Sequence, residues 1–194
     1  AFDGARERGF PGGARRADER GDVFAQRGCE VVALFFPCSL LAVELGEFGG
    51  HYDVVHHTQA IDAWITSGRL KVKPTHERVI YHEPCYLGRH NKEYDAPRRI
   101  LYAVSKDGPL EFELARDKAM CCGAGGGRMW LEETTGTRIN VLRAEQALER
   151  SPKAIATACP YCAIMLRDGV AQLGRGDDIP TRDVAELVAE ALDA

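Results

Sequence analysis

Five of the seven cysteines in this 194-residue chain fall into three groups that could bind metal. Cys85 stands alone, Cys121 and Cys122 are adjacent, and Cys159 and Cys162 form a C-x-x-C element. Thiolates are soft, polarisable ligands that suit iron and sulfide. Adjacent cysteines point apart, so such a pair suits a cluster of several metal ions better than a single ion. Five sulfurs also exceed the number that one tetrahedral zinc ion can use.

Glycines follow the adjacent cysteines directly, at Gly123, Gly125, Gly126 and Gly127. A backbone without side chains approaches a bound group closely and offers N–H donors to sulfur atoms. Such hydrogen bonds raise the reduction potential of a cluster. We therefore expect Gly123, Gly125 and Gly126 to contact a bound cofactor. A plain turn before a helix is the alternative. A dinucleotide-binding loop does not fit, because the G-x-G-x-x-G spacing is missing.

The elements that must position these cysteines alternate between strands and helices. Short apolar runs predict strands at Val31–Phe36, Tyr52–His56, Arg78–His82, Leu110–Leu114, Ala154–Ala158 and up to Ile179. Helices are expected to start at Ser39, to span Gln59–Ser67 and Pro97–Ser105, to end near Arg150, and to carry Cys162 on a first turn. A last helix is expected over Arg182–Leu192, with Thr181 as its N-cap. All five cysteines follow the carboxyl end of an expected strand, which is where ligands bind in parallel sheets.

We therefore expect an α/β fold built from duplicated parallel-sheet lobes, with the cysteine loops at the carboxyl ends of the strands. The duplication is suggested by an internal similarity: the segment from Val31 through Cys38 and the segment from Ala154 through Cys162 follow the same order of elements. The first lobe is expected to be incomplete. The C-x-x-C element is expected on the first turn of a helix, where the helix dipole favours thiolates.

Composition narrows the classes of function. The net charge of −4 provides no basic field that would attract nucleic acid. The longest apolar run, Val31–Pro37, is too short to span a bilayer, and no secretion signal is visible. We therefore expect a cytoplasmic protein, since clustered cysteines in a reducing compartment hold metal more often than they form disulfides.

Several other residues carry two interpretations. His82 and His90 flank Cys85. They either orient the turn or contact a bound group without being its ligands. His56 and His57 are expected to serve packing and hydrogen bonding. Met129 and Trp130 are expected in the core. Four arginines are expected on solvated helix surfaces: Arg98, Arg99, Arg138 and Arg143. The alternative is that they form a docking face for an acidic partner.

The stretches HEPCYLGRHNKEYDAPRRIL, MCCGAGGGRMWLEE and ATACPYCAIMLRDGV resemble the cysteine-rich CCG domain of heterodisulfide reductase and related iron–sulfur proteins. The resemblance runs from about Val31 to the end and is closest to a bacterial branch of membrane-bound, heterodisulfide reductase-related proteins. It implies a non-cubane [4Fe–4S] cluster held by the five cysteines at 85, 121, 122, 159 and 162. It also implies a full-length protein with a membrane portion and further clusters that this sequence lacks.

The resemblance implies an oxidoreductase subunit that passes electrons from a flavin-linked dehydrogenase or electron-transfer flavoprotein to the quinone pool, at the cytoplasmic face of the membrane. Direct reduction of a disulfide, as in heterodisulfide reductase, is an alternative. Two further alternatives are a structural zinc domain and an inactive fragment that binds a cluster but couples to no partner.

One departure from the family pattern concerns the first repeat. Where a C-P-x-C element is expected, this chain has Phe35-Phe36-Pro37-Cys38, and the first CCG element is missing. We therefore expect residues 1–30 to be an atypical or disordered segment, 31–74 the remnant of a first repeat, and 75–194 a complete CCG domain. Cys29 and Cys38 are expected to be free thiols.

Overall fold

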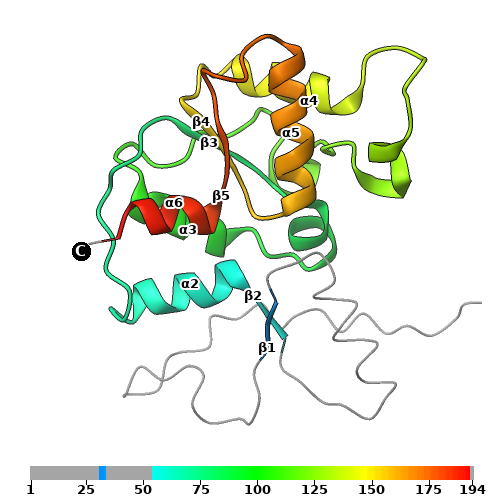
Figure 1. Cartoon of the computed structure of the whole chain (residues 1–194). Helices are drawn as coiled ribbons and strands as arrows, with labels where there is room; N and C mark the ends of the chain where they lie inside the picture. Colours follow the sequence, from blue (N-terminus) through cyan, green and yellow to red (C-terminus); the bar gives the residue numbers. More distant parts are fainter. Residues whose placement is uncertain (1–30, 34–53, 193–194) are drawn as a thin grey trace, which may run out of the picture.

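The computed structural model describes residues 31–33 and 54–192, and in this part of the chain strands and helices form an α/β fold (Figure 1). Strands β1 (Val31–Ala33) and β2 (Val54–His56) pair in parallel. A second parallel sheet has the order β3-β4-β5, with β3 at Val79–His82, β4 at Ala154–Thr157 and β5 at Thr181–Asp183. The α/β class and the parallel pairing agree with the sequence prediction. The expected duplication stays a prediction.

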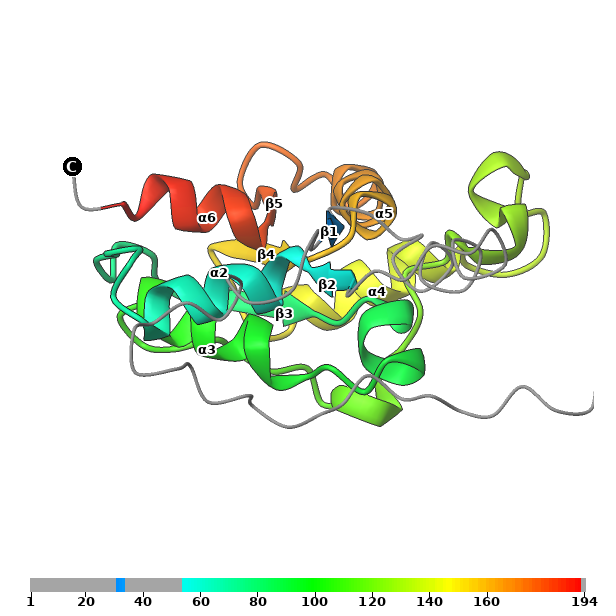
Figure 2. The same ribbon diagram turned by 90° about the horizontal axis from the view of Figure 1, so that it is seen from below.

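Helices cover both faces of the three-stranded sheet (Figures 1 and 2). The α-helices are α2 (His57–Thr66), α3 (Asp95–Val104), α4 (Ile139–Leu148), α5 (Pro160–Gln172) and α6 (Val184–Glu190). Three short helical turns complete the described elements: η1 (Tyr86–His90), η2 (Arg116–Lys118) and η3 (Gly125–Trp130). None of the helices within residues 54–192 combines the length and apolar character needed to cross a membrane.

Alternate residues of β3 enter two separate cores, as the pleat of a strand requires. Val79 and Tyr81 pack with α2, α3 and α6 through residues such as Ile100 and Leu187. Ile80 faces the other way and packs with α4 and α5. A strand buried on both faces needs apolar side chains at consecutive positions, which explains the uninterrupted Val-Ile-Tyr run.

Three expected elements differ in the structure. The last strand does not end at Ile179 but lies at Thr181–Asp183, as β5. Leu110–Leu114 is not a strand: only Leu110 pairs with the sheet, through a parallel bridge to Ile80, and Leu114 is exposed. Thr181 lies in β5 and does not cap the last helix. Asp183 is the N-cap instead, because its carboxylate accepts the Ala185 N–H at 2.8 Å while Glu186 accepts the Asp183 N–H at 2.7 Å. The helix expected from Ser39 and the end of the strand Val31–Phe36 lie outside the described residues.

Two of the four arginines expected at a solvated surface are buried, so that prediction was wrong for Arg98 and Arg143. Arg98 donates to Glu83 Oε1 at 2.7 Å and to Glu111 Oε1 at 2.6 Å. Arg99 is exposed as expected, and its side chain pairs with Asp62. Buried arginines are tolerated when their donors are paired, and this pairing is invisible in the sequence.

The buried Glu83 also connects two loops. Its second carboxylate oxygen, Oε2, accepts the backbone N–H of Arg116 at 2.5 Å. Glu83 follows β3 directly, whereas Arg116 begins η2. The carboxylate therefore connects the loop that follows β3 to the loop that leads to the adjacent cysteines.

We expect Glu83→Gln to lower the free energy of unfolding by about 1.5–3 kcal/mol, the range for a hydrogen bond to a charged group. The loss of stability should be smaller than for a buried charge without any partner, because Arg98 still pairs with Glu111. Urea unfolding followed by circular dichroism measures it. The matched control is Glu111→Gln: its carboxylate is 41% exposed, and it should cost less than about 1 kcal/mol. Equal effects from the two variants would contradict the bridging role of Glu83.

Helices α4 and α5 approach closely at Gly169. A Cβ atom there would lie 2.5 Å from the backbone oxygen of Asn140 and 3.1 Å from Ala144 Cβ. Gly169→Ala gains up to about 1 kcal/mol of helix propensity, but overpacking costs about 1–3 kcal/mol. Since the clash is with backbone, we expect a net loss of stability in urea unfolding.

The control for this substitution is Gly176→Ala, where the nearest atoms to the added Cβ would lie at an ordinary 3.4 Å. We expect it to leave the unfolding midpoint almost unchanged. An unchanged or raised midpoint for Gly169→Ala would mean that the two helices separate without cost.

Candidate metal centre

All five cysteines of the three groups line one cavity of about 360 Å³ at the carboxyl ends of β3 and β4. Its walls are the loop after β3, the loop before η3 and the start of α5. Other lining residues come from elements far apart in sequence: His56, Gln59, Glu93, Met129 and Trp130. The convergence of the three cysteine groups at one sheet edge agrees with the sequence prediction.

Cys85 is positioned by the turn that follows β3. The strand ends at His82, and the half-buried Cys85 is the N-cap of the π-helical turn η1. Burial raises the pKa of its thiol. Arg89, later in the same turn, donates to the backbone oxygen of Ala119 at 2.7 Å. This bond connects the Cys85 loop to the segment that carries Cys121.

Cys159 and Cys162 are positioned by the junction of β4 and α5. Cys159 is the N-cap of α5 in an extended conformation, and Pro160 occupies the first turn. Cys162 lies on that same turn, as the C-x-x-C pattern predicts. Both thiols are buried, and the sulfur of Cys162 lies 3.3 Å from that of Cys122.

The adjacent cysteines lie in the irregular segment between η2 and η3. Cys121 is half-buried and Cys122 is buried. The backbone N–H of Gly123 donates to Cys121 Sγ at 3.2 Å. Gly123 has φ +89°, and a Cβ there would lie 3.1 Å from Ile139 Cβ. Glycine is therefore required at this position, both by its left-handed backbone and by the close approach of α4.

Gly125 and Gly126 also line the cavity, but they are exposed. A Cβ at either would meet nothing within 4 Å, and only Gly126 has a positive φ, of +66°. Neighbouring atoms therefore do not demand glycine at these two positions. Their role as cofactor contacts stays a prediction.

The electrostatics of the cavity centre on Cys122. Hydrogen bonds from the thiols of Cys121 and Cys162 hold the pKa of Cys122 far below its ordinary value. The same contacts raise the pKa of both partners, Cys121 and Cys162. One thiolate shared among thiol donors is the arrangement from which bound metal displaces the remaining protons.

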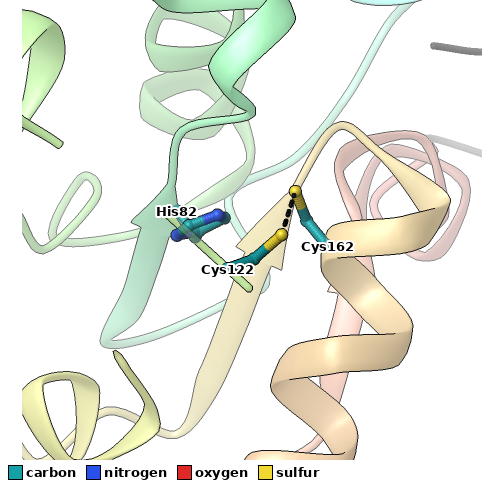
Figure 3. Close-up of side chains that lie close together, drawn as sticks. All are labelled: His82, Cys122 and Cys162. Atoms are coloured by element: carbon teal, nitrogen blue, oxygen red, sulfur yellow. Dashed lines mark hydrogen bonds between the residues drawn. The ribbon is translucent and has the colours of Figure 1, made fainter. Parts of the chain in front are cut away.

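His82 is the histidine that the structure brings to the cysteines. It is buried at the end of β3, and one of its ring nitrogens, Cys122 Sγ and Cys162 Sγ all lie within 4.8 Å of one another (Figure 3). Burial lowers the pKa of His82, so the ring is favoured in its neutral form. His90 is exposed and lies against the ring of Tyr86, with centroids 4.6 Å apart. Of the two residues that sequence reasoning treated alike, only His82 reaches the centre.

Arg143 is the residue whose place beside the centre sequence reasoning missed. Its side chain is fully buried, and its Nε donates to Nδ1 of His82 at 3.2 Å. A hydrophobic pattern assigns an arginine in a helix to the solvent side. The one available signal was the buried strand that ends at His82, whose polar ring needs a buried partner.

Two other expectations can be compared with the structure. Trp130 is 79% exposed, so its expected place in the core was wrong, whereas Met129 packs against the buried cysteines. His56 is buried beside the cavity, and its Nδ1 lies 2.8 Å from Thr58 Oγ1, in agreement with a packing role. Burial lowers the pKa of His56 to about 3.

The donor set fits a multinuclear sulfur-ligated centre. Five soft thiols from three loops face one cavity, and three of them are buried away from solvent. A smaller set, formed by His82, Cys122 and Cys162, could hold a single ion. The geometry therefore offers two kinds of metal binding that differ in the number of sulfurs used.

Comparison with known proteins gives one family and several longer relatives. Residues 79–167 match the CCG cysteine-rich domain. The chain is 45% identical over 155 residues to the "Probable iron-sulfur-binding oxidoreductase FadF" of Bacillus subtilis, covering 79% of this chain and 22% of that protein. It is 40% identical over 158 residues to the "EtfAB:quinone oxidoreductase" of Syntrophomonas wolfei, covering 77% and 22%.

A third relative is one subunit of the "Dihydromethanophenazine:CoB--CoM heterodisulfide reductase" of Methanosarcina barkeri, 34% identical over 171 residues, covering 88% of this chain and 40% of that protein. The chain thus spans about a fifth of the length of the first two relatives and two fifths of the third. The matched residues 79–167 contain all five cysteines of the cavity. The chain therefore belongs, through these residues, to the CCG cysteine-rich domain family.

Proposed function

We propose that this chain binds an iron–sulfur cluster and acts as the electron-transfer component of an oxidoreductase. The observation that carries the proposal is the convergence of five cysteine thiols, from three loops, on one cavity. Proposed as ligands are Cys85, Cys121, Cys122, Cys159 and Cys162. The relatives that are named as an iron-sulfur-binding oxidoreductase and as a quinone oxidoreductase support the same class of function.

A cluster bound here would supply reversible electron transfer at a potential that the protein sets. The chain's own residues would hold and shield it. The N-terminus of α5 favours thiolate at Cys159, and a hydrogen bond from the Cys162 thiol also lowers the pKa of Cys159. The N–H of Gly123 already donates to a sulfur atom, and Gly125 and Gly126 lie where their backbones could approach a bound group.

The cluster type that we propose is a non-cubane [4Fe–4S] centre. The support comes from the donor count and from the adjacent pair. Four cysteines satisfy an ordinary [4Fe–4S] cluster, whereas this cavity offers five. Cys121 and Cys122 occupy different environments, one half-buried and one buried. Such a pair can reach different irons of one opened cluster.

The proposed partners are a flavin-linked dehydrogenase or electron-transfer flavoprotein as donor and the quinone pool as acceptor. Quinone would be reached through a membrane part of a longer protein, at the cytoplasmic face. The relative named as an EtfAB:quinone oxidoreductase supports this route. Direct disulfide reduction is the alternative that the heterodisulfide reductase relative supports.

A structural zinc site is a second candidate, and one specific observation favours it. His82, Cys122 and Cys162 already place three ligand atoms within 4.8 Å of one another. Zinc commonly takes cysteine and histidine ligands in fours, so one more cysteine would complete the site. This candidate predicts a colourless protein in which the remaining cysteines are dispensable.

A metal analysis of the anaerobically purified chain distinguishes the iron–sulfur cluster from the zinc site. We expect about four iron and four acid-labile sulfide per chain, a brown colour and an EPR signal in one oxidation state. Cys121→Ser should abolish or strongly reduce the iron content, because it removes one ligand of the adjacent pair. The matched control is Cys29→Ser, which should leave the iron content unchanged.

Zinc as the sole metal, or iron that survives Cys121→Ser unchanged, would contradict the proposed cluster. The partners are tested separately with the loaded chain in stopped-flow absorbance. Reduction of the oxidised cluster by the reduced electron-transfer flavoprotein, with no oxidation of the reduced cluster by a disulfide substrate, supports the relay. Oxidation of the reduced cluster by the disulfide, with no reduction by the flavoprotein, favours the reductase, and a cluster that exchanges electrons with neither compound would contradict both routes for this chain.

A further inference from the structure

Arg143 holds the imidazole of His82 from the side of α4. Its Nε donates to His82 Nδ1 at 3.2 Å, and its Nη1 donates to Gln146 Oε1 at 2.9 Å. The guanidinium also lies over the ring of Phe112, with its central carbon 3.4 Å from the ring centroid. Two hydrogen bonds and one stacking contact thus fix the plane of the guanidinium beside the imidazole.

The contact between the two side chains determines where the proton of His82 resides. A guanidinium has donors only, so Nδ1 of His82 must present a lone pair to it. A proton on Nδ1 would direct two N–H groups at each other in a buried site. The neutral imidazole therefore carries its proton on Nε2.

The second ring nitrogen faces the sulfur atoms. Figure 3 shows one nitrogen of the His82 ring directed toward Cys122 and Cys162, whose sulfurs lie 3.3 Å apart. The nitrogen and the two sulfurs lie within 4.8 Å of one another. Since Nδ1 is occupied by Arg143, the nitrogen that faces the sulfurs is Nε2, which is the protonated one.

We infer that Nε2–H of His82 donates a hydrogen bond to Cys122 Sγ, and that Arg143 is the positioning residue that fixes this direction. The consequence for electron transfer rests on the proposed function. A sulfur that accepts a hydrogen bond carries less electron density, so the reduced form of a bound cluster is stabilised and its potential rises. The tautomer itself is a property of the chain without metal.

The inference also separates His82 from the cysteine ligands. A ligating histidine must offer a lone pair to the metal. In His82 the only lone pair lies on Nδ1 and accepts the hydrogen bond from Arg143. His82 therefore acts on Cys122 and is not itself a ligand, which leaves metal binding to the five thiols.

The tautomer is tested first on the full chain without metal. Nitrogen-15 NMR of labelled histidines should show His82 with its proton on Nε2 and Nδ1 as the acceptor. Arg143→Met should remove this preference, whereas Arg143→Lys, whose ammonium is also a donor only, should retain it. A proton on Nδ1 in the unsubstituted chain would overturn the inference.

The consequence is tested by redox titration of the iron-loaded chain. His82→Leu removes the donor and should shift the reduction potential to a more negative value. His82→Gln should restore most of the shift, because its amide N–H can take the place of Nε2–H. Arg143→Met should shift the potential in the same direction as His82→Leu. The control is Arg99→Met, whose arginine side chain is 53% exposed and pairs with Asp62, and which should cause no shift.

The outcomes separate this inference from the proposed function. Loss of iron from His82→Leu would make His82 a ligand and overturn the inference. Equal potentials for His82→Leu and His82→Gln would also overturn it. A chain that takes up no cluster but shows the expected tautomer contradicts the proposed function and leaves the His82–Arg143 arrangement standing.

Discussion

The parallel pairing of β3 and β4 is the constraint on which the cavity depends. In this register His82 lies opposite Thr157, so both strands end at the same level. The chain then reaches Cys85 and Cys159 within three residues of each strand end, at one edge of the sheet. Backbone hydrogen bonds thereby place two of the three cysteine groups, because the register of the β3–β4 pair aligns the two strand ends.

The third cysteine group has no strand of its own and depends on side chains instead. Arg89 and Glu83, both in the first loop, bond to backbone atoms of the segment that precedes Cys121. Arg98 in turn holds Glu83. Burying charged groups is expensive unless they are paired, and here the pairs hold together two loops that have no common strand. This role explains why charges are buried beside an otherwise apolar core.

Sequence reasoning succeeded where local pattern decides the structure. The apolar runs at 78–82 and 154–158 and the C-x-x-C element fixed strand ends and a helix start, and therefore the meeting of the cysteines. It failed where partners from distant segments decide. Thr181 and Asp183 are both good N-caps, and only the pairing of β5 with β4 assigns Thr181 to the sheet. Arg143 looks like a surface residue until β3 brings His82 beside it.

Three of the cavity's five cysteines are buried, and two are half-buried. Cys122, Cys159 and Cys162 are buried toward the sheet, where His82 and Arg143 also lie. Cys85 and Cys121 are half-buried, on loops that the Arg89 and Glu83 bonds described above join to each other. A fixed dipole acts most strongly where water is excluded, whereas electron exchange with a partner needs an accessible edge. The proposed potential-setting contacts therefore lie at the buried part of the site, and the proposed route of electrons at its half-buried part.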